Sequence, residues 1–90
     1  MLYRQKFDTF IRIYDDVGYI TSKSNNNDRV FDASGAVFLR ALSRKARTLE
    51  ALCEEIAGSF VDVSPADIIN DVLDFYSVLE QDGFVVSGET

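Results

Sequence analysis

The stretch from Ser64 to Gly83 is a helix pattern with both ends marked, and it limits how the rest of this chain can fold. Ser64 is a favourable N-cap residue, and Pro65 suits the first helical position because its missing N–H has no helical partner there. Asp67 lies in the first turn, where a negative charge faces the positive end of the helix dipole. Gly83 can adopt the left-handed conformation that closes a helix. We therefore predict a helix over residues 65 to 82.

The apolar residues of this helix form two neighbouring lines rather than one. Ile68, Val72, Phe75 and Leu79 fall at helical spacing on the first line, and Ile69, Leu73 and Tyr76 form the second. A helix that covers one side of a core needs a narrower apolar stripe than this. Either both lines are buried in a small core, or one is buried and part of the other lines a groove.

The segments before the helix have strand composition. Residues 7–14 and 17–22 are rich in β-branched and aromatic residues, and Asp15-Asp16 between them is a turn signal, so they predict a β-hairpin. Residues 23–28 form a polar loop with three Asn residues, and Arg29 to Asp32 predicts a brief third strand. A sheet that stops at so short a strand leaves unpaired N–H and C=O groups. Such an edge is a liability or a docking place for another extended chain.

Two more helices precede the long one. Residues 33–42 predict a helix capped by Asp32 or Ser34. Residues 43–47 form a basic connector. Thr48 then caps a second helix, which ends near Phe60. After Gly83, residues 84–86 predict a short strand. We expect an α+β, winged-helix-like domain over residues 1–86, with a three-stranded antiparallel sheet followed by three helices and a short C-terminal strand; residues 87–90 form a linker or tail.

The composition argues against catalysis and against metal or cofactor binding. The chain has no His and a single Cys, Cys53, so the usual neutral-pH base and the usual zinc or iron–sulfur ligand sets are missing. Its five glycines form neither a phosphate-binding loop nor a dinucleotide fingerprint. We expect a non-enzyme without a cofactor. An unpaired thiol and the lack of a long apolar run favour a cytoplasmic protein that does not interact with membrane.

The charge is divided unevenly along the chain. Residues 1–47 hold all nine Lys and Arg against five acidic residues, a balance of +4, whereas residues 48–90 hold ten acidic residues and no base, a balance of −10. The long helix carries five of these acids. A helix that enters the DNA major groove needs Lys or Arg near the phosphates, so we exclude nucleic acid as the partner. An acidic surface attracts basic peptides instead.

Three runs of residues resemble the PqqD-like family, the RiPP recognition elements that bind leader peptides of ribosomally made, post-translationally modified peptides. The runs are Arg29 to Leu42, Arg47 to Leu52, and Asp71 to Val85, and the resemblance extends over about residues 7 to 86. Phe31-Asp32 stands where this family often has Leu-Asn, and Arg44 to Arg47 where a Gly-containing turn is common. The Met1 start, the Tyr-rich first strands and the tail resemble the N-terminal domain of a radical SAM/SPASM peptide maturase, which implies such an enzyme as partner in cis or in trans.

The resemblance implies that a leader peptide adds as an antiparallel strand to the edge at residues 29–32, in a cleft beside helix 65–82. Four acids, Asp67, Asp71, Asp74 and Asp82, border the first apolar line of this helix, so we expect the leader to present apolar residues flanked by Lys or Arg. The expected peptide-binding residues are Arg29, Val30, Phe31, Asp32, Asp71, Val72, Phe75, Val78 and Leu79. The alternative is a winged-helix protein interaction or dimerisation module of a regulator, which would use the same acidic helix on a partner domain.

Overall fold

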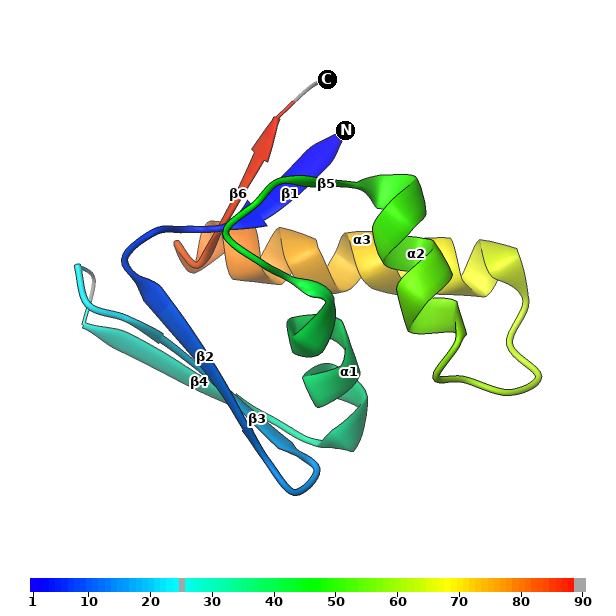
Figure 1. The fold of residues 1–90 in the computed structure, drawn as a ribbon, viewed down its shortest axis with the longest axis horizontal. Coiled ribbons are helices and arrows are strands. Elements are labelled where there is room, and N and C mark those ends of the chain that lie inside the picture. The colour runs from blue at the N-terminus through cyan, green and yellow to red at the C-terminus, as the bar shows by residue number, and fades with distance from the viewer. Residues whose placement is uncertain (25, 89–90) are drawn as a thin grey trace.

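The computed structural model describes residues 1–24 and 26–88. Its three helices are α1 (Ala33–Ala41), α2 (Leu49–Ala57) and α3 (Pro65–Gln81). Its strands are β1 (Leu2–Gln5), β2 (Thr9–Tyr14), β3 (Val17–Ser22), β4 (Asn27–Phe31), β5 (Arg47–Thr48) and β6 (Val85–Gly88). The helices lie together on one side of the sheet formed by β2, β3 and β4 (Figure 1).

The predicted α+β arrangement is confirmed. Strands β2, β3 and β4 form a three-stranded antiparallel sheet in that order, and three helices and a C-terminal strand follow it. Tyr14 pairs with Val17 across the Asp15-Asp16 turn, and Asp15 has the positive φ of 53° that a tight hairpin turn requires. The hairpin predicted from the sequence is therefore present.

A second small sheet, in the order β5-β1-β6, was not predicted. The strand expected over residues 7–14 is in fact preceded by a separate strand, β1, and a turn at residues 6–8 sends the two into different sheets. β1 pairs with β6 from Leu2↔Gly88 to Gln5↔Val85, which joins the two ends of the described chain. Strand composition alone carries no information about such distant partners, so the sequence pattern could not assign β1 to a sheet.

Several boundaries differ from expectation. Part of the basic connector, Arg47, forms β5 with Thr48, and β4 begins at Asn27, two residues before the predicted strand. β6 continues to Gly88, beyond the predicted strand 84–86, because Ser87 pairs with Tyr3. Asn25 of the predicted loop and residues 89–90 of the predicted tail lie outside the described residues.

Helix α3 begins and ends where its sequence signals indicate. The Ser64 hydroxyl accepts a hydrogen bond from the Asp67 N–H at 3.2 Å, and Pro65 is the first helical residue. Gly83 has a φ of 84°, and the Phe84 N–H donates to the Leu79 carbonyl at 2.9 Å, which closes the helix. These two ends set the length of α3.

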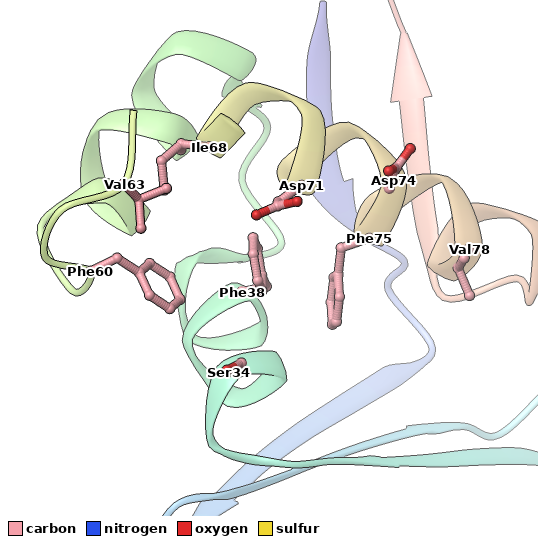
Figure 2. Close-up of a pocket in the computed structure, with 9 residues that line it drawn as sticks. All are labelled: Ser34, Phe38, Phe60, Val63, Ile68, Asp71, Asp74, Phe75 and Val78. Atoms are coloured by element: carbon pink, nitrogen blue, oxygen red, sulfur yellow. The ribbon is translucent and has the colours of Figure 1, made fainter. Parts of the chain in front are cut away.

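The core forms where α3 crosses α1. Ile68, Val72, Tyr76 and Leu79 of α3 are buried, and so are Phe38 and Leu39 of α1. Phe75 stacks on Phe38 with ring centroids 4.7 Å apart, and the two rings face each other between the helices (Figure 2). Tyr76, the next residue, points fully into the core.

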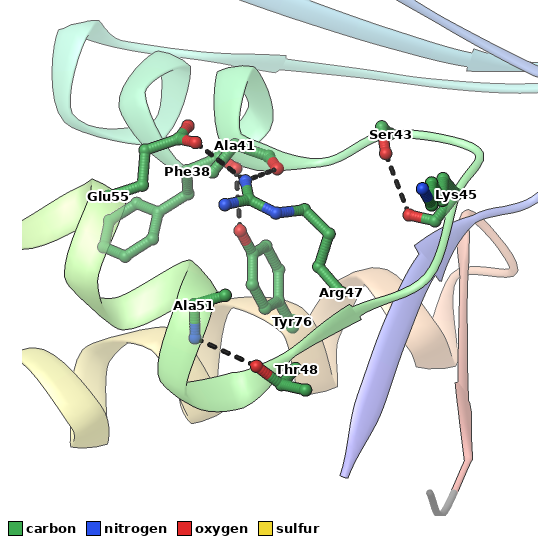
Figure 3. A network of polar contacts seen from close by, with 9 residues as sticks. All are labelled: Phe38, Ala41, Ser43, Lys45, Arg47, Thr48, Ala51, Glu55 and Tyr76. Atoms are coloured by element: carbon green, nitrogen blue, oxygen red, sulfur yellow. Dashed lines mark hydrogen bonds and ion pairs between the residues drawn. The ribbon is translucent and has the colours of Figure 1, made fainter.

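Tyr76 also satisfies the end of α1 (Figure 3). The last carbonyls of a helix have no partner within the helix, and buried carbonyls need one. The Tyr76 hydroxyl donates to the Phe38 carbonyl at 2.9 Å, and Arg47 Nη1 donates to the Ala41 carbonyl at 2.9 Å. Arg47 also forms an ion pair of 2.7 Å with Glu55 of α2. Side chains from α3 and β5 therefore complete the C-terminus of α1.

Gly35 sits at the point where β4 turns into α1. The Asp32 carboxylate accepts from the Gly35 N–H at 3.2 Å and caps the helix, so of the two predicted caps Asp32 is the one used. A Cβ atom on Gly35 would lie 2.4 Å from the Cβ of Phe31. The close contact between β4 and the first turn of α1 therefore requires glycine, for lack of space rather than for backbone freedom.

We predict that Gly35→Ala lowers the free energy of unfolding by about 1 to 3 kcal/mol, because overpacking at Phe31 outweighs the helix propensity gained. The matched control is Gly58→Ala at the end of α2, where an added Cβ would lie 3.4 Å from the Glu55 carbonyl, an ordinary contact. Urea unfolding followed by circular dichroism measures both variants. Equal midpoints for Gly35→Ala and the parent chain would contradict the prediction.

We also predict that Tyr76→Phe costs about 1 to 3 kcal/mol, because the buried Phe38 carbonyl loses its donor. Burial raises the pKa of Tyr76 above its ordinary value of 10.0. The unfolded chain therefore releases this proton first as the pH rises past 10, and the stability falls there. Denaturant titrations from pH 8 to 11 should show a shallower alkaline loss for Tyr76→Phe; an identical loss would contradict this role of Tyr76.

Candidate functional site

Strand β4 is an edge of its sheet. It pairs with β3 from Gly18↔Phe31 to Ser22↔Asn27, and no other strand in the described part of the chain pairs with its far side. Pairs alternate in an antiparallel ladder, and the pair that flanks a two-residue hairpin turn is hydrogen-bonded. The backbone N–H and C=O groups of β3 therefore bond to β2 at Val17, Tyr19 and Thr21. They bond to β4 at Gly18, Ile20 and Ser22. It follows that Asp28 and Val30 direct their backbone N–H and C=O groups to the free edge.

The side chains of Asn27, Arg29 and Phe31 point from β4 towards α3. The Phe31 ring lies 4.9 Å from the Phe75 ring, centroid to centroid. Arg29 Nη1 forms an ion pair of 2.6 Å with Asp82 at the end of α3. The Arg29 guanidinium also lies 5.5 Å from the centroid of the Phe31 ring. These contacts hold the free edge of β4 beside α3.

A hollow of about 420 Å³ opens between α1, α3 and the segment that joins α2 to α3 (Figure 2). Its walls are mostly aromatic and aliphatic side chains, which are the usual lining of a site for apolar groups. Val78 is 42% exposed there, and Val63 40%. The lining residues are Ser34, Phe38, Phe60, Val63, Ile68, Asp71, Asp74, Phe75 and Val78.

The charged groups of the hollow are all acidic. Asp71 and Asp74 are both exposed on α3 (Figure 2), and no Lys or Arg is among the lining residues of the hollow. Ser34 adds a hydroxyl from the first turn of α1. The hollow can therefore accept an apolar side chain and, at its rim, hydrogen-bond or pair with a cationic one.

The structure brings together some of the predicted site residues and separates others. Asp71, Phe75 and Val78 line the hollow, and Arg29, Val30 and Phe31 lie on the edge strand β4. Asp32 caps α1. Val72 and Leu79 are fully buried in the core, so the expectation that they face a groove does not fit this structure. The first apolar line of α3 is thus divided: Phe75 is half-exposed and lines the hollow with Ile68, whereas Val72 and Leu79 are in the core.

Sequence reasoning missed several residues of the hollow. Phe38, Phe60 and Val63 lie outside α3 and were not expected at a site, and Ser34 was considered only as a cap. Ile68 belongs to the first apolar line of α3 but was not among the expected peptide-binding residues. Of the predicted acidic border, Asp71 and Asp74 line the hollow. Asp67 and Asp82 do not, and Asp82 instead pairs with Arg29. The sequence did contain one signal for this part of the hollow: two valines, Val61 and Val63, precede the Ser64 cap. Apolar residues there belong to no helix stripe, and both are exposed in the structure.

Chemistry beyond binding has little support among the described residues. They contain no cluster of three or more His, Cys, Asp or Glu side chains that could hold a metal ion. Cys53 is half-buried, and burial together with Glu50 raises the pKa of its thiol, which makes it a poor nucleophile. None of the helices in residues 1–24 and 26–88 is long and apolar enough to cross a membrane.

Comparison with known proteins gives two findings. The family model described as "Coenzyme PQQ synthesis protein D (PqqD)" matches residues 26–85, which span β4 to the start of β6. The solved structure "TbiB1 in Complex with the TbiA(beta) Leader Peptide" superposes with a TM-score of 0.82 at 15% identity, over 97% of this chain and 99% of that one. No curated protein matches the chain. At that sequence identity the superposition shows a shared fold. The family match extends over two thirds of the residues, including the edge strand β4, the hollow and α3. The chain therefore belongs to the PqqD family.

Proposed function

We propose that this domain is a RiPP recognition element that captures the leader of a ribosomally made precursor peptide. The leader adds as an antiparallel strand to the free edge of β4 and continues along α3. The observation that carries the proposal is the open edge of β4 next to an apolar hollow of about 420 Å³. The family match and the solved relative, whose title names a leader peptide, support it.

The backbone of the leader would bond to the N–H and C=O groups of Asp28 and Val30. These are the groups that the alternation of the β3–β4 ladder leaves at the free edge. Strand addition of this kind takes its affinity from main-chain hydrogen bonds, which any sequence can supply. Specificity must then come from side chains.

Alternate side chains of an added strand point to opposite faces. Those on the α3 side would meet Phe31, Phe75 and Val78 and enter the hollow, which suits Leu, Ile, Phe or Tyr. Asp71 and Asp74 at the rim favour Lys or Arg beside these apolar residues. A leader with apolar residues flanked by basic ones fits best.

The captured leader is presented to a modifying enzyme, for which we propose a radical SAM/SPASM maturase acting in cis or in trans. The recognition domain itself is non-catalytic, in keeping with a site that offers two carboxylates, one hydroxyl and otherwise apolar groups. The competing function is a winged-helix protein interaction or dimerisation module of a regulator. Light scattering of the domain without peptide helps to separate the two, because a stable dimer would favour this alternative.

We predict that Val30→Pro weakens leader binding at least about tenfold, because it removes a backbone donor at the free edge. The ladder to β3 does not use the Val30 N–H, so the fold survives. The matched control Val30→Ala keeps the donor and binds nearly as well as the parent chain. Fluorescence anisotropy measures the affinity of the parent chain and both variants for a labelled precursor peptide, the one whose gene lies nearest the gene of this chain. Equal affinity for the Pro and Ala variants, with unchanged circular dichroism, would rule out strand addition on β4.

We predict that Asp71→Asn with Asp74→Asn weakens binding of a basic leader by several-fold and flattens its salt dependence, because exposed charges are screened by salt. The control pair Asp16→Asn with Glu50→Gln removes two exposed charges away from the hollow. Titrations at low and high NaCl compare the slopes. A slope that falls equally in both double variants would mean that net charge, not the rim, attracts the peptide.

A further inference from the structure

A second hollow, of about 210 Å³, lies between α2 and the start of α3. Apolar side chains form most of its walls, and Ile69 among them is 41% exposed. Val61, in the segment that joins the two helices, is 84% exposed. Exposed apolar side chains that gather around a hollow mark an interaction site, whereas scattered ones do not. The apolar walls of the second hollow are Cys53, Ala57, Val63, Pro65, Ile68 and Ile69.

The second hollow borders the first, the one lined by Phe75 and Val78. Val63 and Ile68 line both hollows. They lie near each other at the end of the first hollow that is closest to the start of α3 (Figure 2). Ile68 is buried beneath both hollows, whereas Val63 is 40% exposed between them. A peptide that occupies the first hollow therefore reaches the second by passing over the side chain of Val63.

The direction of an added strand decides which part of a leader arrives there. β4 begins at Asn27, which contacts the Asp82 carbonyl at the end of α3, and ends at Phe31, which contacts Phe75 near the middle of α3. A strand antiparallel to β4 therefore runs from the level of Phe75 towards Asp82. The residues that precede this strand in the leader lie beside the first half of α3, where both hollows open.

The distance from the strand to the second hollow is short. From Phe75 back to Ile68 is about 10 Å along the axis of α3, a length that about three extended residues span. The first hollow alone cannot take all of the segment that precedes the strand, because that segment continues past Val63. The second hollow is the next apolar surface on its path.

The charge around the second hollow fits the same kind of partner as the first hollow. Glu54 is the charged residue among its lining, and residues 48–90 contain ten acids and no Lys or Arg. A second copy of the chain docked through this surface would set acids against acids. A peptide segment with apolar side chains flanked by Lys or Arg is complementary to both hollows.

We propose that the leader residues upstream of the added strand occupy the second hollow, between α2 and α3. This inference rests on the proposed leader capture and extends the contact beyond the cleft between β4 and α3. An apolar side chain of the leader packs against Ala57 and Ile69, and a neighbouring Lys or Arg pairs with Glu54. The leader then carries a second apolar anchor roughly three to five residues before the one that meets Phe75.

Cys53 reports directly whether the second hollow is filled, because it is the single cysteine of the chain and one of the walls. Burial and Glu50 raise the pKa of its thiol, so alkylation by iodoacetamide is run at about pH 8.5 and followed by mass spectrometry. An excess of the precursor leader used above should slow alkylation at least about fivefold.

The control is a shortened leader from a series truncated one residue at a time from the N-terminus. It is the shortest member whose binding Val30→Pro still weakens, so it keeps the added strand and lacks the upstream segment. At the same fractional occupancy it should leave the alkylation rate within about twofold of the rate for the free domain. This control removes the effect of general stabilisation, since both leaders stabilise the fold by binding.

Ile69→Ala tests the same contact through affinity. We expect it to weaken the full-length leader about fivefold and to leave the shortened leader unchanged, because only the longer peptide reaches Ile69. The matched control Val78→Ala truncates a residue that is 42% exposed and lines the first hollow but not the second. It should weaken both peptides equally. Fluorescence anisotropy measures the affinities, and circular dichroism verifies that both variants fold.

The outcomes separate this inference from leader capture. If no peptide binds the parent chain, leader capture fails and this inference fails with it. If the full-length leader binds, is weakened by Val30→Pro and leaves Cys53 as reactive as in the free domain, leader capture stands and the second hollow is overturned. Equal protection by both leaders, or equal weakening of both by Ile69→Ala, overturns it as well. So does alkylation that slows as the domain is concentrated without peptide, because a second copy is then the occupant.

Discussion

The hydrogen bond from the Tyr76 hydroxyl to the Phe38 carbonyl fixes the crossing of α3 over α1, and the rest of the structure depends on that crossing. Phe38 contributes one of the carbonyls that a helix C-terminus leaves without a partner, and it is buried, so only a donor from elsewhere can satisfy it. Tyr76 also contacts the Tyr3 ring of β1 at 5.4 Å between centroids. One side chain therefore connects α3, α1 and the second sheet.

The position of Tyr76 determines what its neighbour does. Adjacent residues on a helix point in directions about 100° apart, so with Tyr76 directed into the core, Phe75 lies at its margin and contacts Phe31 and Phe38. The same rotation leaves Asp71, Asp74 and Val78 on the open side of α3, next to the hollow. The candidate site is thus a consequence of how the core is packed, and no separate element builds it.

Much of the fold was predictable because its signals are local. Ser64, Pro65 and Gly83 mark the ends of α3, Thr48 caps α2 with a 3.1 Å bond from the Ala51 N–H, and Asp15-Asp16 marks the hairpin. The second sheet was missed because the pairing of β1 with β6 joins residues eighty or more positions apart, which no local pattern encodes. The candidate site was predicted only in part, because its lining also depends on packing between distant parts of the chain. Periodicity gave the apolar lines of α3, but the choice between Val72 as core and Val78 as surface depends on α1 and Tyr3, which pack from elsewhere in the chain.

The Arg29–Asp82 ion pair holds the free edge of β4 beside α3 only weakly. Its side chains are 43% and 28% exposed, and an exposed pair of this kind contributes at most about 1 kcal/mol. Asp82 also accepts, through its backbone carbonyl, a 3.4 Å contact from Asn27. These contacts position β4 against the end of α3, yet separating the two would cost little free energy. The Phe31–Phe75 contact does not depend on charge, so β4 stays beside α3 when Arg29 exchanges Asp82 for another carboxylate. The leader that we propose as ligand would therefore tolerate an acidic residue best near Arg29, and worst beside Asp71 and Asp74.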